Sequence, residues 1–144
     1  MSNLFSLDGQ TALITGASSG LGRHFALTLA KAGARVAVCA RRADRLKDLV
    51  QEIEAFDGRA MAFSMDDTDH DSIVAAGDGA ETELGAIHVL INNAGTTVTK
   101  KILDFTVEDY DFVMDTNLKG AWLVGQEVGP VSYTHLTLPT TPYV

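Results

Sequence analysis

Glycines gather in one short stretch near the N-terminus, Thr15–Gly22, which reads TGASSGLG. The stretch follows a short apolar run and precedes an amphipathic one, so we expect it to turn a buried strand into a helix. Glycines allow the backbone to approach a ligand closely, and a helix N-terminus offers unpaired N–H groups to phosphate. We therefore predict a nucleotide diphosphate site here, formed by Gly16, Ser18, Ser19, Gly20, Leu21 and Gly22. The alternative is a structural turn without a ligand.

Two arginines, Arg41 and Arg42, follow a second apolar run, Arg35–Cys39. In dinucleotide-binding folds an acidic residue near this point accepts hydrogen bonds from the ribose 2′-OH and repels a 2′-phosphate. Here the position is Ala40. Guanidinium groups suit a phosphate dianion, so the pattern favours NADP(H) over NAD(H). The alternative is that both arginines only solvate the first turn of the next helix.

Strand and helix patterns alternate along the chain. Apolar runs predict buried strands at Thr11–Thr15, Arg35–Cys39, Arg59–Met65 and Ile87–Ile91. Helices are expected between them and after Thr106, where Asp109 completes a capping-box pattern. In the first helix we expect Leu21, Phe25 and Leu29, with Ala26 and Ala30 beside them, to form the apolar face. In the last helical region, which we expect to run to about Val128, we expect an irregularity. Apolar runs without polar alternation indicate a parallel sheet covered on both faces, the doubly wound, Rossmann-type α/β class.

Composition excludes several other classes of protein. The formal net charge of −8 argues against a nucleic-acid partner, and the single cysteine argues against disulfides and multi-cysteine zinc sites. No apolar run approaches the ~20 residues that span a bilayer, and the N-terminus does not resemble a secretory signal. We expect a cytoplasmic protein with no metal and no membrane partner.

The composition changes near the C-terminus. All three prolines lie at or after Pro130, and no charged residue follows Glu127. Residues 131–141, VSYTHLTLPTT, resemble a translated sequencing adapter. We expect residues 1–129 to form the folded part and residues 130–144 to be a non-native or unstructured tail. A genuine, poorly packed extension is the alternative.

Taken together, these motifs resemble the short-chain dehydrogenase/reductase family. The family's cofactor motif matches Thr15–Gly22, and its second signature matches Asn92–Gly95, which reads NNAG. A third matches Asn117–Gly120, which reads NLKG, and Asp66 stands where the family has an aspartate after the third strand. The resemblance covers about residues 7–128 and implies an oxidoreductase that transfers a hydride between nicotinamide and a ketone or secondary alcohol.

The resemblance also implies roles for residues outside the glycine turn. Asp66 would bond the adenine amino group, and the next residue, here Asp67, would flank the ring. The family more often has an apolar residue at that position, and an acidic helix N-terminus is the alternative reading of both aspartates. Asn93, Ala94 and Gly95 would line the cofactor, while Asn92 would support the central sheet.

The family's proton-transfer groups are a serine, a tyrosine with a lysine four residues later, and an asparagine. Asn117 fits the asparagine, although a polar residue at a helix irregularity is an equal reading of that position alone. No Tyr-x-x-x-Lys occurs, because Tyr110 is followed by Met114 and Tyr133 by Thr137. We expect a catalytically inactive N-terminal fragment, truncated after about four strands and four helices. The alternatives are a non-catalytic nucleotide-binding module and an inert truncated product; the full-length protein is expected to be a homo-oligomer.

Overall fold

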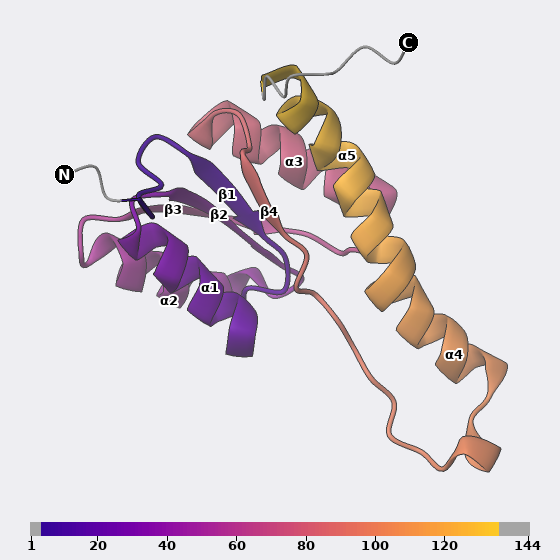
Figure 1. Cartoon of the computed structure of the whole chain (residues 1–144). Helices are drawn as coiled ribbons and strands as arrows, with labels where there is room; N and C mark the ends of the chain where they lie inside the picture. The colour runs from indigo at the N-terminus through magenta and orange to yellow at the C-terminus, as the bar shows by residue number, and fades with distance from the viewer. Residues whose placement is uncertain (1–3, 136–144) are drawn as a thin grey trace, which may run out of the picture.

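A computed structural model describes residues 4–135 of the chain (Figure 1). Strands and helices alternate from the N-terminus, and the second half of the described chain is mostly helical. The elements are β1 (Thr11–Ile14), α1 (Gly20–Lys31), β2 (Arg35–Ala40), α2 (Ala43–Glu54), β3 (Arg59–Ser64), α3 (His70–Leu84), β4 (Val89–Ile91), the 3-10 turn η1 (Ile102–Asp104), α4 (Val107–Met114), the π-helical turn η2 (Asp115–Gly120) and α5 (Ala121–His135).

The strands form one parallel sheet in the order β3-β2-β1-β4. Thr11 pairs with Arg35 between β1 and β2, and Ala12 pairs with Val89 between β1 and β4. The order reverses at β1, so the carboxyl ends of β1 and β4 flank a crevice of the kind in which doubly wound sheets bind ligands. The expected doubly wound α/β class is confirmed.

Helices cover both faces of the sheet. α1 and α2 lie on one face, and α3 with α5 lie on the other (Figure 1). Neighbouring residues of β1 divide between the two sides: Ile14 packs in the first core and Leu13 in the second. This alternation between two buried faces explains why the strands read as continuous apolar runs.

The buried face of α1 differs from the one expected from its large residues. Gly22, Ala26 and Ala30 are buried, whereas the side chain of Leu21 is 67% exposed. Small residues bring the helix axis close to the sheet, and this close approach overrides the preference of leucine for burial. Ala26 and Ala30 of the expected face are therefore confirmed and Leu29 packs partly buried against the same core, whereas the expected burial of Leu21 was wrong.

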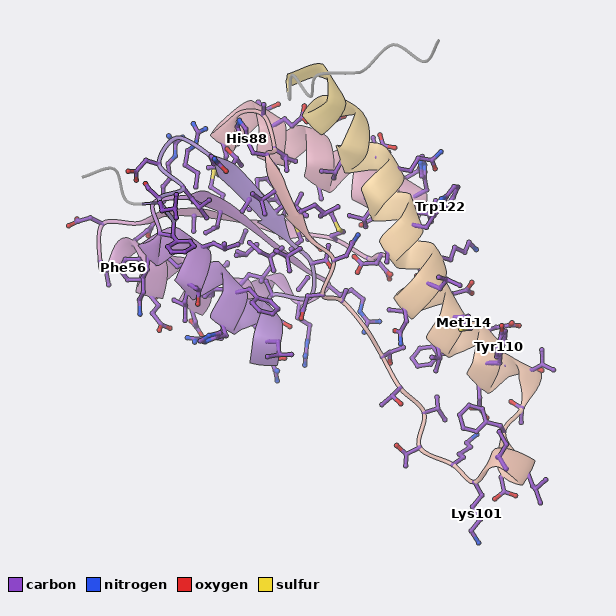
Figure 2. The ribbon with its side chains drawn as sticks, in the orientation of Figure 1. Phe56, His88, Lys101, Tyr110, Met114 and Trp122 are labelled. Carbon is purple, nitrogen blue, oxygen red and sulfur yellow. The ribbon has the colours of Figure 1, made fainter. Side chains whose placement is uncertain are left out.

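The segment of residues 97–122, called the arm below, projects away from the sheet and returns to it at α5 (Figure 1). Figure 2 shows its side chains, among them the labelled Lys101, Tyr110 and Trp122. The capping box of Thr106 and Asp109 is present at the start of α4. The expected irregularity is the π-helical turn η2, which separates α4 from α5. Helix α5 continues to His135, so it does not end near Val128, and residues 136–144 of the expected tail lie outside the described residues.

Candidate functional site

The glycine turn lies at the carboxyl end of β1. Gly16 and Gly20 have φ values of +63° and +57°, a region that strongly favours glycine. A Cβ atom on Gly16 would lie 2.8 Å from the Cα of Ala94, so the turn and the loop after β4 are in direct contact. The N–H of Ala17 donates to the carbonyl of Cys39 (3.0 Å), which ties the turn to β2 as well.

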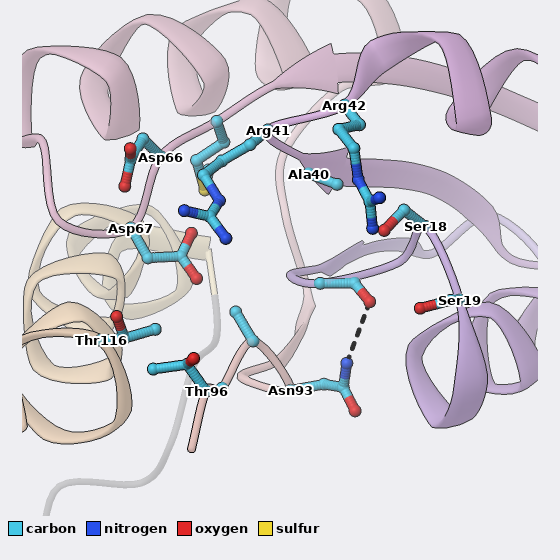
Figure 3. A pocket seen from close by; sticks show the side chains of 14 residues that line it. Ser18, Ser19, Ala40, Arg41, Arg42, Asp66, Asp67, Asn93, Thr96 and Thr116 are labelled. Carbon is cyan, nitrogen blue, oxygen red and sulfur yellow. Dashed lines mark hydrogen bonds between the residues drawn. The ribbon is translucent and has the colours of Figure 1, made fainter. Parts of the chain in front are cut away.

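Thr15 and Asn93 hold the turn against the loop after β4. The buried Thr15 hydroxyl accepts hydrogen bonds from the N–H groups of Asn93 (3.0 Å) and Ala94 (2.9 Å). The Asn93 amide donates in return to the carbonyls of Thr15 (3.0 Å) and Gly16 (3.2 Å), the latter drawn in Figure 3. Gly22 leaves the space for that amide, because a Cβ there would lie 2.5 Å from its nitrogen.

A cleft of about 320 Å³ opens above these contacts (Figure 3). It is lined by the glycine turn, the ends of β2 and β3, the loop after β4 and one residue of η2. The lining residues are Gly16, Ser18, Ser19, Ala40, Arg41, Arg42, Met65, Asp66, Asp67, Asn93, Ala94, Gly95, Thr96 and Thr116. Ten of the residues predicted from sequence thus come together around one cleft, although their ligand contacts stay predictions.

The two arginines of the cleft face different surroundings. The guanidinium group of Arg42 points toward Ser18 in the glycine turn (Figure 3). Arg41 turns instead toward the two aspartates that follow β3. Both side chains are exposed, and the residue before them at the end of β2 is the small, buried Ala40. The cleft therefore carries positive charge on both sides of the end of β2.

The two neighbouring aspartates are in different electrostatic states. Oδ1 of Asp66 accepts hydrogen bonds from the Thr68 hydroxyl (2.7 Å) and N–H (3.0 Å), and these bonds lower the pKa of Asp66. Burial raises the pKa of Asp67 to about 6; the charge of Asp66 adds to this rise and Arg41 opposes it. Near neutral pH, Asp66 is a firm hydrogen-bond acceptor, whereas Asp67 is close to its titration range.

The other predicted site residues lie beside the cleft. Gly20, Leu21 and Gly22 begin α1 and do not line it. Asn117, in η2, donates to the Thr96 carbonyl (2.9 Å) and accepts from the Thr96 N–H (2.7 Å). Asn117 therefore joins the arm to the loop after β4; its catalytic role stays a prediction. Asn92 donates to the carbonyl of Ala121 (3.0 Å), so its amide supports α5 and not a neighbouring strand.

Sequence reasoning assigned no site role to four residues: Thr15, Met65, Thr96 and Thr116. Thr15 is the first residue of the glycine motif. Its hydroxyl accepts hydrogen bonds from the loop after β4, a structural role that its position at the end of a buried strand suggests. Met65 directly follows β3, a position that points to the crevice of a parallel sheet. Thr96 and Thr116 come from a loop and a π-helical turn, for which the sequence carries no periodic signal.

No group of three or more His, Cys, Asp or Glu side chains within residues 4–135 is arranged to hold a metal ion. In the same part of the chain, none of the helices has both the length and the apolar character needed to cross a bilayer. Cys39 is fully buried in β2, and burial raises the pKa of its thiol far above the usual range. The cysteine is therefore a core residue, unsuited to act as a nucleophile.

The chemistry of the cleft fits a dinucleotide. Ser19 precedes α1 without a side-chain capping bond, and the N–H groups of a first helical turn lack intrahelical acceptors. The two arginines provide donors for a further phosphate, and Asp66 provides an acceptor for an amino group. These groups lie along one cleft from the start of α1 to the end of β3, so they can contact different parts of one extended ligand.

Comparisons with known proteins agree with this arrangement. The profile of the family described as short chain dehydrogenase matches residues 10–133. A gluconate 5-dehydrogenase from Gluconobacter oxydans is 38% identical over 126 residues, which are 88% of this chain and 49% of that protein. A 3-oxoacyl-(acyl-carrier-protein) reductase from Thermotoga maritima is 37% identical over 124 residues, or 86% of this chain and 50% of that protein. The chain thus spans about half the length of the curated relatives it matches.

Solved structures show the same likeness. A short-chain type dehydrogenase/reductase from Mycobacterium marinum superposes with a TM-score of 0.86 at 39% identity, covering 89% of this chain and 52% of that one. A metagenomic short-chain oxidoreductase in complex with NADP has a TM-score of 0.83 at 32% identity, covering 89% of this chain and 58% of the other.

Proposed function

The chain belongs to the short-chain dehydrogenase family, and from this membership we propose that it binds NADP(H) as the cofactor-binding part of a carbonyl-reducing or alcohol-oxidising enzyme. When bound, the nicotinamide supplies the hydride that the reaction transfers. The residues described here would bind and orient the dinucleotide. The first turn of α1, with Ser18 and Ser19, would hold the diphosphate, and Asp66 would accept from the adenine amino group.

The observation that carries the choice of NADP(H) is the pair of arginines at the end of β2. Arg41 and Arg42 both line the cleft, and Ala40 stands where an acidic side chain would repel a 2′-phosphate. Their donors outnumber the acceptors that a ribose hydroxyl could use. One structural neighbour was solved with NADP, which agrees with this choice.

Paired nucleotide titrations test the phosphate assignment. Nicotinamide fluorescence would follow the binding of NADPH and of NADH to the purified chain. Replacing Arg41→Gln or Arg42→Gln should weaken NADPH binding by about tenfold or more, because a charge-assisted hydrogen bond is lost, and leave NADH nearly unchanged. Arg45→Gln, which removes the same charge from the exposed face of α2, is the matched control. Equal losses for the two nucleotides would refute the assignment.

Hydride transfer also needs a proton donor near the substrate oxygen. In this chain Asn117 fits one member of the family's set, and no tyrosine is followed by a lysine four residues later. We therefore propose that this 144-residue chain binds cofactor weakly and turns over no carbonyl substrate by itself. NADPH oxidation followed at its absorbance band with a panel of ketones tests this; consumption above the blank would contradict it.

The arm supports a further proposal for the whole protein. Leu118 and Trp122 are each 61% exposed, on neighbouring turns of η2 and α5. Large apolar side chains that gather on one surface often mark a protein–protein contact. We therefore propose that the whole protein self-associates. Its proposed substrate is a small ketone or secondary alcohol.

A further inference from the structure

Asp67 is an acidic residue at a position where an apolar side chain would suit an adenine ring and a hydrogen-bond donor would suit a phosphate. It lines the cleft between Asp66 and the loop after β4, and Figure 3 shows its carboxylate directed toward the guanidinium group of Arg41. Gly120 allows the close approach of η2 that half-buries Asp67, since a Cβ on Gly120 would lie 2.8 Å from the Asp67 carbonyl. The acid is thus held inside the cleft.

We propose that Asp67 is a specificity-determining residue: its carboxylate competes with the 2′-phosphate of NADP(H) for Arg41, and binding of the phosphorylated cofactor is coupled to protonation of Asp67. The inference rests on the proposed function, because it assumes that Arg41 contacts the phosphate. Asp67 and the phosphate are both anions, and one guanidinium group near both of them cannot fully neutralise the two charges. Protonating Asp67 removes the repulsion and frees Arg41.

The surroundings of Asp67 leave Arg41 as the cation that acts on it. Asp66, on the same segment, raises its pKa, and Arg41, from the loop after β2, lowers it. The Cys39 thiol on β2 also interacts with Asp67 but stays protonated. On the helical side, Asp115 pairs with Lys119 (3.5 Å) in η2, and His70 of α3 pairs with Glu127 of α5 (3.5 Å). The lining residues contributed by the loop after β4 and by η2 are uncharged.

Asp67 titrates close to neutral pH, so the coupling between its protonation and NADPH binding can be measured. The pKa of Asp67 is about 6, so the carboxyl is mostly ionised at pH 7.5 and takes up a proton when a nearby anion stabilises its neutral form. Coupling is reciprocal: if protonation favours NADPH, NADPH favours protonation by the same factor.

The first test needs no cofactor. Carboxyl ¹³C NMR would follow the titration of Asp67 in the free chain and in the variants Arg41→Gln and Arg45→Gln. Arg41→Gln should raise the pKa of Asp67 above about 6, and Arg45→Gln should leave it unchanged. An Asp67 titration that Arg41→Gln does not move would overturn the competition, whatever the chain binds.

The second test compares Asp67→Asn with Asp78→Asn, which removes the same charge from an exposed position of α3. At pH 7.5, Asp67→Asn should tighten NADPH binding at least about fivefold, the lower end of typical coupling, and change NADH binding less than about twofold. The difference should vanish near pH 5, where Asp67 is protonated. Asp78→Asn should change neither affinity.

Calorimetry in buffers of different ionisation enthalpy supplies a readout that a merely structural role would not move. NADPH binding at pH 7 should take up protons in the unmodified chain, and Asp67→Asn should abolish that uptake while keeping any contribution from the phosphate itself. If both proteins bind NADPH with equal proton uptake, the inference about Asp67 is wrong but the proposed function still stands. A chain that binds neither nucleotide would overturn the proposed function, and the inference with it.

Discussion

The glycine turn and the arm are built on opposite principles. The turn is held by contacts between residues far apart in sequence: Thr15 bonds the loop after β4, and Gly22 makes room for the amide of Asn93. The arm is held mainly by near neighbours, through the capping box of Thr106 with Asp109 and the pair of Lys100 with Asp109 (2.6 Å). None of the residues of η1 or α4 is buried.

The cleft is thus ordered by tertiary contacts, whereas the arm is ordered mainly by local ones. Around the cleft, Thr15, the Gly16 carbonyl and the Ala17 N–H have tertiary partners, so the geometry there depends on the whole sheet. In the arm, Leu103 is 94% exposed and Trp122 61% exposed, so the segment gains little from burial in this chain. Substitutions should therefore be costly at the turn and nearly neutral in the arm.

The largest effect is expected at Gly22. Gly22→Ala would place a methyl group against the Gly16 carbonyl and the Asn93 amide, and we expect a loss of about 3 kcal/mol in the free energy of unfolding. Urea denaturation would measure it. Gly77→Ala in α3 is the control: a Cβ there meets nothing within 4 Å, and alanine should stabilise the helix by about 1 kcal/mol. If both substitutions change the free energy of unfolding equally, the turn is no more sensitive to substitution than α3.

Thr15→Val should have the next largest effect. The valine keeps the shape of the buried side chain but removes the acceptor of two backbone N–H groups, so we expect a loss of about 2 kcal/mol. Thr15→Ser keeps the hydroxyl and should retain most of the stability. If Ser and Val variants unfold alike in urea, the hydroxyl does not hold the turn.

Asp67→Asn should change stability in a pH-dependent way. A raised pKa in the folded state means that the stability present below the ordinary value of 3.8 is lost as pH rises toward about 6. The asparagine variant escapes this loss, so at pH 8 it should be more stable by about 1 kcal/mol after allowance for solvent screening. Unfolding curves at pH 8 and pH 4 check this, and an equal gain at both would contradict it.

The smallest effect on stability is expected in the arm. The double substitution Leu118→Ser with Trp122→Ser should change the free energy of unfolding by less than about 0.5 kcal/mol, because both side chains are exposed. It should also reduce self-association of the chain in sedimentation experiments. Val124→Ser, at a fully buried position of α5, is the control and should be strongly destabilising. A large loss from the arm variant would show that the arm is packed in solution.

Sequence patterns predicted what local signals encode. The strands, the capping box at Thr106 and the helix irregularity followed from periodicity and cap chemistry, and each is confirmed. The face of α1 was predicted in part: Ala26 and Ala30 are buried as expected, but Leu21 is exposed, because hydrophobicity alone does not tell that Gly22 must meet the sheet.

Long-range geometry was beyond such patterns. In the sequence Arg41 and Arg42 are simply adjacent. In the fold Arg41 turns toward Asp67, whereas Arg42 turns toward Ser18. Thr96 and Thr116 join the cleft only because η2 returns the chain to the loop after β4. Neither residue lies in a pattern with a period, so only the fold brings them to the site.

The π-helical turn η2 also bears on how this chain can change in length. A π turn holds more residues than an α turn, so deleting a single residue between Asp115 and Gly120 would let an uninterrupted α-helix form. The wide turn takes up the extra residue locally, so the side chains after it would keep nearly the same directions around the helix axis. Val124 and Val128 would stay buried against α3 and the sheet. A deletion within the regular helix α5 would instead rotate every later side chain by about 100°. Descendants of this sequence should therefore tolerate a deletion in η2 more readily than one in α5.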